Sequence, residues 1–377
     1  RALHAPSLIH SRALSRLPFT MAATASAVTR DVPATLIKSV AGGDGGRITT
    51  VPSKYVFRSA AQAASDPAEN LPTIDFSQLT SGDPAERSRA IEELGKACRD
   101  WGFFMVTNHG AEAAVDAMLG ACEAFFELPE EEKRAYAAEH NLSPINAGTS
   151  FNRFADGETA QCWRDFLILF FHPDLHAPDK PPQFREAAAE YRRAGRGVGL
   201  ELLRAASASL GLSEDRLERA SRQEEGFSQL TANLYPPCPQ PELAMGIASH
   251  TDDAILSLVV QNGVGGLQLL RDGRWYNVHA PPRSYLVILG DHMEMMSNGR
   301  YRSAIHRGVV NSSSTRMSVA FSISPSWESI LAPLPELVDE THPPSYRPIK
   351  YEDYFKMSTE AVVKDSLLSE VRLPVKA

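Results

Sequence analysis

The second half of the chain contains a series of short runs rich in aliphatic and β-branched residues, separated by turn residues. These runs occupy residues 256–261, 267–270, 275–278, 285–289, 304–310 and 317–323. Between two of them, Asp272 and Gly273 are typical of a two-residue hairpin turn, because Gly accepts a positive φ. Strands at a spacing of about ten residues predict a compact sandwich or barrel.

The first half favours helices. Asp83 and Pro84 are typical of an N-cap and a first helical position, and they precede a helix that carries Ile91, Leu94 and Cys98. Further helices are expected near 112–126, 129–138 and 181–211, with short strands at 71–76 and 103–107. We therefore expect residues 1–70 to form a leader and a flexible arm, 71–225 a mainly helical region packed on the core, and 226–377 a β core with a C-terminal helix.

The composition favours a globular protein that handles a small molecule. With 377 residues, of which 43% are hydrophobic, the chain can bury a sizeable core. A formal net charge of −8 argues against a broad nucleic-acid surface, because phosphate binding needs clustered Lys and Arg. No apolar run approaches the roughly 20 residues of a membrane-spanning helix. We expect a small-molecule substrate, no nucleic-acid or membrane partner, and a monomer.

Cysteine usage and the first residues bear on the cellular compartment. The four cysteines are Cys98, Cys122, Cys162 and Cys238. They are scattered without a CxxC pair, which favours a reducing environment. Residues 1–20 carry several Arg and Ser and no acid, as a transit peptide does, but Met21 is also a plausible start. We interpret residues 1–20 as a leader or an added segment, and expect a cytoplasmic protein.

The motif His250-Thr-Asp252 is the strongest local signal for chemistry. In a strand, residues i and i+2 project from the same face, so these two side chains can bind one metal ion. His306, on a later β run, can supply a second imidazole. Two His and one carboxylate form the facial triad that binds Fe(II) and leaves positions open, whereas structural zinc usually has four protein ligands that include Cys. Alone, the pattern is weak, because the chain has 11 histidines.

Arg316-Met-Ser318 supports the triad. Strand alternation places the guanidinium and the hydroxyl on one face, where they can hold the far carboxylate of a dicarboxylate. An ordinary surface ion pair is the alternative. It is disfavoured because Arg316 precedes the apolar stretch 319–323, where an unpaired charge is costly.

Together these motifs resemble the plant 2-oxoglutarate/Fe(II)-dependent dioxygenases, which include flavonoid, gibberellin and alkaloid oxidases. The resemblance covers residues 70–360 approximately and rests on motifs in a fixed order. They are Trp101-Gly-Phe-Phe-Met-Val-Thr-Asn-His-Gly110, Asn233-Leu-Tyr-Pro-Pro-Cys-Pro239, His250-Thr-Asp252, Gly265-Gly-Leu-Gln268, Ser297-Asn-Gly299, His306-Arg307 and Arg316-Met-Ser318.

The resemblance implies a mixed α+β fold with a double-stranded β-helix (jelly roll) core and flanking N-terminal and C-terminal helices. It implies Fe(II) held by His250, Asp252 and His306. It also implies that the cosubstrate is held by Arg316 and Ser318, with further contacts from Asn233 and Tyr235.

Five residues are candidates for the lining of the substrate pocket. Trp163 resembles the tryptophan of the family's segment beside the pocket, although a core position suits it equally. The remaining candidates are Phe151, Phe154, Phe166 and Ser322. Ser322 stands where relatives often carry an inward aromatic residue, which leaves a roomier or more polar wall.

Three further residues could be metal ligands by residue type, but we expect them to have structural roles. We expect His109 to have a packing role away from the metal. We expect Asp291 and His292, placed on a strand after Gly290, to make turn and core hydrogen bonds.

By resemblance, the reaction consumes O₂ and 2-oxoglutarate, releases succinate and CO₂, and hydroxylates a specialised metabolite or a hormone-like small acid, with ascorbate as the reductant. Alternatives are an ethylene-forming type of oxidase that uses ascorbate in place of 2-oxoglutarate, a non-catalytic binding protein on the same scaffold, and a zinc-dependent isomerase. The substrate itself cannot be read from the motifs, because specificity lies in loops and pocket shape.

Overall fold

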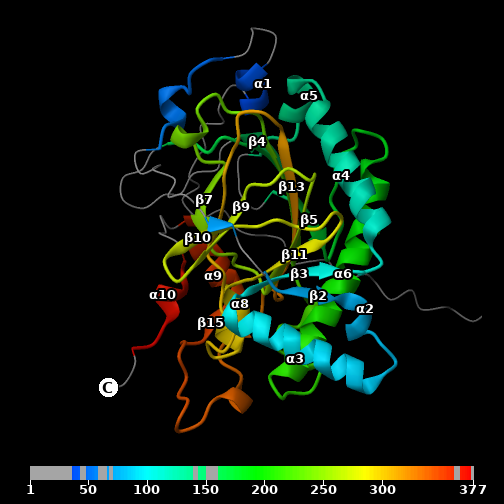
Figure 1. Cartoon of the computed structure of the whole chain (residues 1–377), viewed down its shortest axis with the longest axis vertical. Helices are drawn as coiled ribbons and strands as arrows, with labels where there is room; N and C mark the ends of the chain where they lie inside the picture. The colour runs from blue at the N-terminus through cyan, green and yellow to red at the C-terminus, as the bar shows by residue number, and fades with distance from the viewer. Residues whose placement is uncertain are drawn as a thin grey trace, which may run out of the picture.

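Two β-sheets of different size form the centre of the molecule (Figure 1). The computed structural model describes residues 36–42, 48–57, 66–67, 71–138, 143–149, 160–360 and 366–374. The larger sheet has the order β2 (Thr73–Asp75), β3 (Phe103–Thr107), β11 (Tyr285–Leu289), β8 (Leu256–Gln261), β13 (Arg316–Ile323), β6 (Ser228–Tyr235), β5 (Asp165–His172), β4 (Ile145–Thr149). The smaller sheet has the order β1 (Asp66–Pro67), β10 (Arg274–Asn277), β9 (Leu267–Arg271), β12 (His306–Gly308), β7 (Ile247–His250). A further pair joins β14 (Ile330–Leu331) to β15 (Ile349–Lys350).

After β6 the chain passes back and forth between the two sheets, with the hairpin of β9 and β10 kept within the smaller one, so segments distant in sequence become neighbours. In the larger sheet β13 lies between β6 and β8, and in the smaller sheet β12 lies between β7 and β9, all antiparallel. This interleaving gives the jelly-roll core that the resemblance predicts.

Helices cover the larger sheet and flank the core. They are α1 (Ile37–Gly42), α2 (Phe76–Leu79), α3 (Pro84–Asp100), α4 (Glu112–Glu127), α5 (Glu130–Arg134), α6 (Phe184–Ser209), α7 (Arg216–Ala220), α8 (Asp291–Met296), α9 (Tyr351–Glu360) and α10 (Leu368–Val371). Figure 1 shows α4 and α6 side by side along the larger sheet, where both contact β13. Within the described part of the chain, no helix is both long and apolar enough to cross a membrane.

The start of α3 confirms the sequence-based prediction. The Asp83 carboxylate accepts a hydrogen bond from the amide of Ala85 at 2.8 Å, and Pro84 occupies the first turn. Leu94 and Cys98 are buried on the helix face that meets the core. Capping and a single apolar stripe therefore define this helix locally.

Helix α6 packs closely against β13 because two of its buried residues are glycines. A Cβ on Gly195 would lie 2.9 Å from a ring carbon of Phe321, and one on Gly199 would lie 2.0 Å from Cδ1 of Ile323. Because glycine has no side chain, α6 can pack directly against β13, the strand that carries Arg316.

Several sequence-based predictions meet the structure directly. The strands predicted at 256–261 and 285–289 are β8 and β11 without change, whereas the run 304–310 forms only the three-residue β12. The placement of Asp291 and His292 on a strand is wrong, because both residues lie in the first turn of α8. The strand ends at Leu289, and Gly290 is the N-cap of the helix.

Two described pieces of the segment predicted to be a flexible arm are packed into the molecule. Helix α1 begins where the Asp165 carboxylate accepts hydrogen bonds from the amides of Ile37 and Lys38 at 2.8 and 3.0 Å. Tyr55 is fully buried, with its ring edge-on to Trp163 at a centroid distance of 5.2 Å. This part of the arm therefore packs against residues 160–165.

Candidate metal centre and ligand cavity

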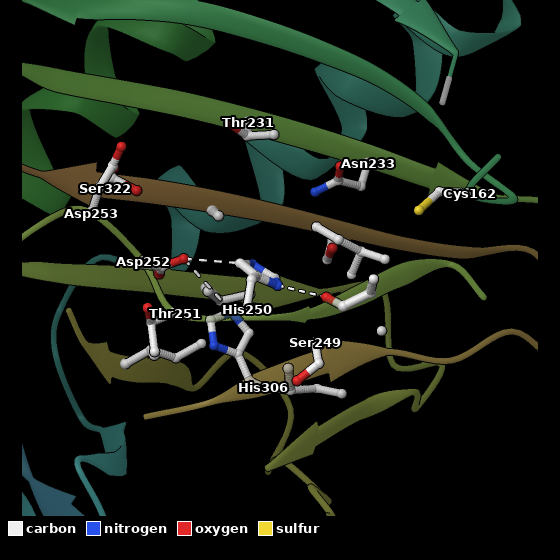
Figure 2. Close-up of a pocket in the computed structure, with 18 of the residues that line it drawn as sticks. Cys162, Thr231, Asn233, Ser249, His250, Thr251, Asp252, Asp253, His306 and Ser322 are labelled. Carbon is white, nitrogen blue, oxygen red and sulfur yellow. Dashed lines mark hydrogen bonds and ion pairs between the residues drawn. The ribbon is translucent and has the colours of Figure 1, made fainter. Parts of the chain in front are cut away.

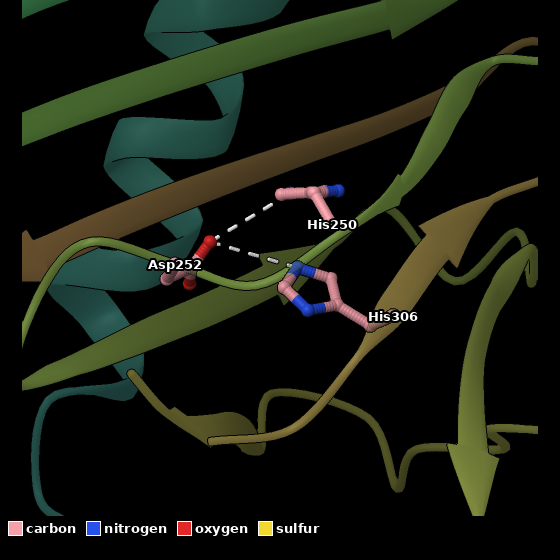
Figure 3. Close-up of side chains that lie close together, drawn as sticks. All are labelled: His250, Asp252 and His306. Atoms are coloured by element: carbon pink, nitrogen blue, oxygen red, sulfur yellow. Dashed lines mark ion pairs between the residues drawn. The ribbon is translucent and has the colours of Figure 1, made fainter. Parts of the chain in front are cut away.

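His250, Asp252 and His306 converge at one point of the smaller sheet (Figure 3). His250 ends β7 and His306 begins β12, and the two residues are paired across these antiparallel strands. Asp252 Oδ1 lies 3.7 Å from Nε2 of each histidine. The ligand atoms all lie within 4.8 Å of one another, so a single ion can bind all of them. The structure therefore confirms that the predicted residues can form a facial triad.

Backbone carbonyls fix the protonation of both imidazoles. Nδ1 of His250 contacts the Ala248 carbonyl at 2.8 Å, and Nδ1 of His306 contacts the Ala304 carbonyl at 3.0 Å. A carbonyl can only accept, so Nδ1 carries the proton and Nε2 keeps its lone pair for a metal. Removal from bulk water, together with the adjacent His306, lowers the pKa of His250. The neutral form that a metal requires is therefore favoured at neutral pH.

A buried acid supports the segment that carries Asp252. The amide of Asp291 donates to the Asp252 carbonyl at 2.8 Å, and the Asp291 carboxyl accepts from the hydroxyls of Ser303 and Tyr354 at 2.7 and 2.6 Å. Burial raises the pKa of Asp291 to about 7. Asp291 thus makes the core hydrogen bonds expected from the sequence, although on a helix.

The triad lies in a cavity of about 380 Å³ that residues of both sheets line (Figure 2). Figure 2 shows Thr231 and Asn233 of β6 across the cavity from His306. Residues of α9 and the segment after it, among them Phe355, Ser358 and Leu367, also contribute to the lining. Cavities of this size suit small molecules rather than macromolecules.

The larger sheet contributes a buried cation to the same cavity. Arg316 is 2% exposed, its guanidinium lies 4.7 Å from the ring centroid of Tyr235, and its Nε and Nη1 have no acceptor in the described chain. Ser318 and Asn233 face each other on β13 and β6, and both line the cavity. The alternative of a surface ion pair is excluded for Arg316 by its burial. An anionic ligand is the partner that this arrangement lacks.

Comparisons with known proteins agree with this geometry. Residues 226–325 match the model of the 2OG-Fe(II) oxygenase superfamily, and residues 71–189 match that of the N-terminal region of non-haem dioxygenases in morphine synthesis. The 2-oxoglutarate-dependent dioxygenase 19 of Oryza sativa subsp. japonica is 42% identical over 83% of this chain and 93% of that relative. The chain belongs to this family of plant 2-oxoglutarate/Fe(II)-dependent dioxygenases.

Two further relatives extend the comparison. The flavanone 3-dioxygenase 2 of the same rice is 37% identical over 81% of this chain and 90% of its own length. The crystal structure of JOX2 in complex with 2OG, Fe and JA is 29% identical, with a TM-score of 0.80 over 91% of this chain and 98% of that one. The sequence comparisons thus show the family, the structural comparison shows the fold, and the structure of this chain shows the triad.

The residues present fit the family's iron and cosubstrate. Two neutral imidazoles and one carboxylate on a single side are the donor set that suits Fe(II) with positions left open. The guanidinium of Arg316, whose Nε and Nη1 have no acceptor in the described chain, supplies the fork for a carboxylate. In this enzyme, Fe(II) and 2-oxoglutarate are therefore the cofactor and the cosubstrate.

Only some of the residues that we predicted for the substrate pocket line the cavity. Ser322 lines the cavity, and its hydroxyl lies 3.0 Å from that of Ser257, in accord with a polar wall. Trp163 does not line the cavity, because its ring is fully buried behind the wall and its Nε1 donates to the Pro236 carbonyl at 3.0 Å. Phe166 is also buried and lies beside a separate small cavity. Phe151 and Phe154 lie outside the described residues.

His109 has the packing role that we expected. Its Nε2 donates to the Arg283 carbonyl at 2.7 Å, its Nδ1 accepts from the amide of Ala111 at 3.1 Å, and its ring packs on Tyr285. Both nitrogens are satisfied without a metal.

Sequence reasoning missed several polar residues of the cavity wall, among them Arg164, Gln229 and Thr231. A signal for them exists. On β6, Gln229 and Thr231 alternate in phase with Asn233, so the period of two that brings Asn233 to the cavity also brings them. On the segment leading into β5, Arg164 alternates in the same way with Cys162 and Ile168, which also line the cavity.

Proposed function

We propose that this dioxygenase hydroxylates a small plant metabolite or hormone, with conversion of 2-oxoglutarate to succinate and CO₂. The observation that carries the proposal is the joint opening of the His250–Asp252–His306 cluster and of Arg316 into one cavity of about 380 Å³. When bound, the iron supplies the activation of O₂ that C–H oxidation requires. Ascorbate is proposed as the reductant that keeps the iron ferrous.

The residues of the protein bind and orient 2-oxoglutarate and the substrate. Arg316 and Ser318 on β13 are proposed to hold the far carboxylate of 2-oxoglutarate, with Asn233 and Tyr235 on β6 beside it. The substrate then occupies the remaining part of the cavity, toward Thr231 and Ser322 on the larger sheet. This wall offers hydroxyl groups, so it favours a substrate with polar substituents over a wholly apolar one.

The test is turnover with matched variants. Purified protein is supplied with Fe(II), 2-oxoglutarate, O₂ and ascorbate together with a library of plant metabolites. Succinate and mass gains of one oxygen are measured by mass spectrometry. We expect stoichiometric succinate and hydroxylated product from the wild type and at least a 100-fold loss in His250→Ala and Asp252→Ala, since each removes a metal ligand. Full turnover in either variant contradicts the ligand assignment.

Cosubstrate dependence separates the proposal from its rivals. An ascorbate-dependent oxidase would turn over with ascorbate when 2-oxoglutarate is left out. A non-catalytic binding protein would form no succinate with any compound of the library.

A further inference from the structure

Arg164 is a second buried guanidinium in the cavity wall. It is 7% exposed and lines the cavity, just before the first residue of β5. Its neighbours on both sides point the other way and are fixed. Trp163 donates from Nε1 to the Pro236 carbonyl, and the Asp165 carboxylate caps α1. The backbone therefore holds the Arg164 side chain on the cavity side.

The contacts of Arg164 leave Nε of the guanidinium without an acceptor among the described residues. Nη1 donates to Oδ1 of Asn233, and the guanidinium lies 5.8 Å from the ring centroid of Phe166. Nε is buried and has no acceptor in the described chain. The edge formed by Nε and Nη2 is the one that binds the two oxygens of a carboxylate side by side.

No acid of the described cavity wall compensates this charge. Asp252 belongs to the metal cluster, Asp253 accepts from the Ser358 hydroxyl at 2.7 Å, and Asp291 accepts from Ser303 and Tyr354. Among the described ion pairs, none includes Arg164. A buried cation without an anionic partner is costly, so its presence in a ligand cavity points to a ligand that carries the missing charge.

The cosubstrate does not account for both arginines. Arg316 on β13 also has buried guanidinium nitrogens, Nε and Nη1, without an acceptor in the described chain, and it is the residue proposed for 2-oxoglutarate. Arg164 reaches the cavity from the segment that leads into β5, a strand on the far side of β6 from β13. Asn233 lies between them, with its carbonyl oxygen turned to Arg164. One guanidinium is therefore left for the second organic ligand, the substrate.

We propose that Arg164 binds a carboxylate of the primary substrate, so that the preferred substrates of this enzyme are small organic acids. The inference rests on the proposed function, because it assigns the occupant of the same cavity. Binding at Arg164 orients the acid from one end and presents the rest of the molecule to the cavity. Arg164 is thus a specificity-determining residue for the hydroxylation.

The test measures binding, not turnover, so that its failure differs from failure of the proposed reaction. Full-length protein loaded with Mn(II) and 2-oxoglutarate is titrated calorimetrically with small aromatic and aliphatic carboxylic acids and with the methyl ester of each. We expect at least one acid to bind tenfold or more tightly than its ester. Arg164→Gln should weaken that acid at least tenfold and leave the ester unchanged, and Arg164→Lys should recover part of the loss, because it restores the charge without the two-pronged edge.

Two controls separate substrate binding from a merely structural role. Arg274→Gln removes an exposed arginine of β10 and should leave acid binding unchanged. The affinity for 2-oxoglutarate should stay within about threefold in Arg164→Gln, which also shows that the variant is folded. The proposal is overturned if no acid binds, if esters bind as well as acids, or if Arg164→Gln weakens acid, ester and 2-oxoglutarate alike. Absence of succinate with Fe(II) would instead count against the proposed function.

Discussion

Gly290 keeps the end of β11 in close contact with the segment that carries Asp252. Its φ of −100° is open to any residue, so space is what requires glycine here. A Cβ would lie 2.2 Å from the Ala254 carbonyl oxygen and 2.7 Å from that of Asp252. Both are backbone atoms, which cannot turn aside as a side chain can. The metal site thus depends on a residue that is not a ligand.

We expect Gly290→Ala to displace the Asp252 segment and to lower the affinity for Mn(II) at least tenfold. The matched control is Gly197→Ala, because a Cβ at Gly197 meets nothing within 4 Å. Isothermal titration with Mn(II), alongside circular dichroism to verify folding, measures the effect. An affinity equal to that of the control would show that the segment has room to move.

At the scale of single elements, the contact of α6 with β13 makes two glycines of one helix respond in opposite ways to the same substitution. Gly197 is exposed, so Gly197→Ala should stabilise the protein by about 0.5–1 kcal/mol. Gly199→Ala places a Cβ 2.0 Å from Cδ1 of the fully buried Ile323 and should destabilise by about 1–3 kcal/mol. Urea denaturation measures both. Stabilisation by Gly199→Ala would mean that Ile323 repacks freely.

The stability of the protein should depend on pH through the buried carboxyl group of Asp165, which caps α1. Burial raises the pKa of Asp165 to about 6, although the amides of α1, Thr149 and the charge of Lys133 favour the carboxylate. The folded state therefore holds the proton more tightly than the unfolded chain. The resulting stabilisation is complete below about pH 4 and is lost as the pH rises through about 6.

The comparison variant for this dependence is Asp165→Asn, which does not titrate. We expect the free energy of unfolding of the wild type, relative to Asp165→Asn, to fall by about 2–3 kcal/mol between pH 4 and pH 7.5. Chemical denaturation at several pH values gives the difference. A difference that does not vary with pH would contradict the raised pKa.

Local signals explain which elements could be predicted from the sequence. Capping by Asp83 and the period of two in β8 and β11 depend only on neighbours in sequence, so the prediction succeeded there. Helix α8 was missed because it is six residues long and its apolar residues continue the pattern of β11. Docking of α1 was also missed, because its cap comes from Asp165, which is 128 residues away from Ile37.

At the scale of the whole molecule, the site also contains residues that local sequence patterns predict and residues that only the structure reveals. The triad and Arg316 could be predicted because each is part of a short motif, and strand alternation places its members together. Alternation indicates only the side on which Arg164 lies, whereas its importance comes from its burial and from an Nε without an acceptor, which the structure reveals. The resemblance predicts Trp163 at the pocket because its segment lies there, but its ring is buried on the side of that segment away from the cavity.

The two sheets supply different halves of the site, so its ligands should stabilise the whole molecule when they bind together. The metal residues belong to β7, its following segment and β12 of the smaller sheet, whereas Arg316 and Ser318 belong to β13 of the larger sheet. A ligand at 100 times its Kd adds about 2.7 kcal/mol of stability. We expect Mn(II) at that ratio to raise the Tm by several degrees, and 2-oxoglutarate to raise it further only when Mn(II) is present. In His250→Ala both shifts should be lost, while Arg316→Gln should keep the metal shift and lose that of 2-oxoglutarate. Thermal unfolding followed by circular dichroism distinguishes these cases, and a full 2-oxoglutarate shift in Arg316→Gln would show that the larger sheet does not hold the cosubstrate.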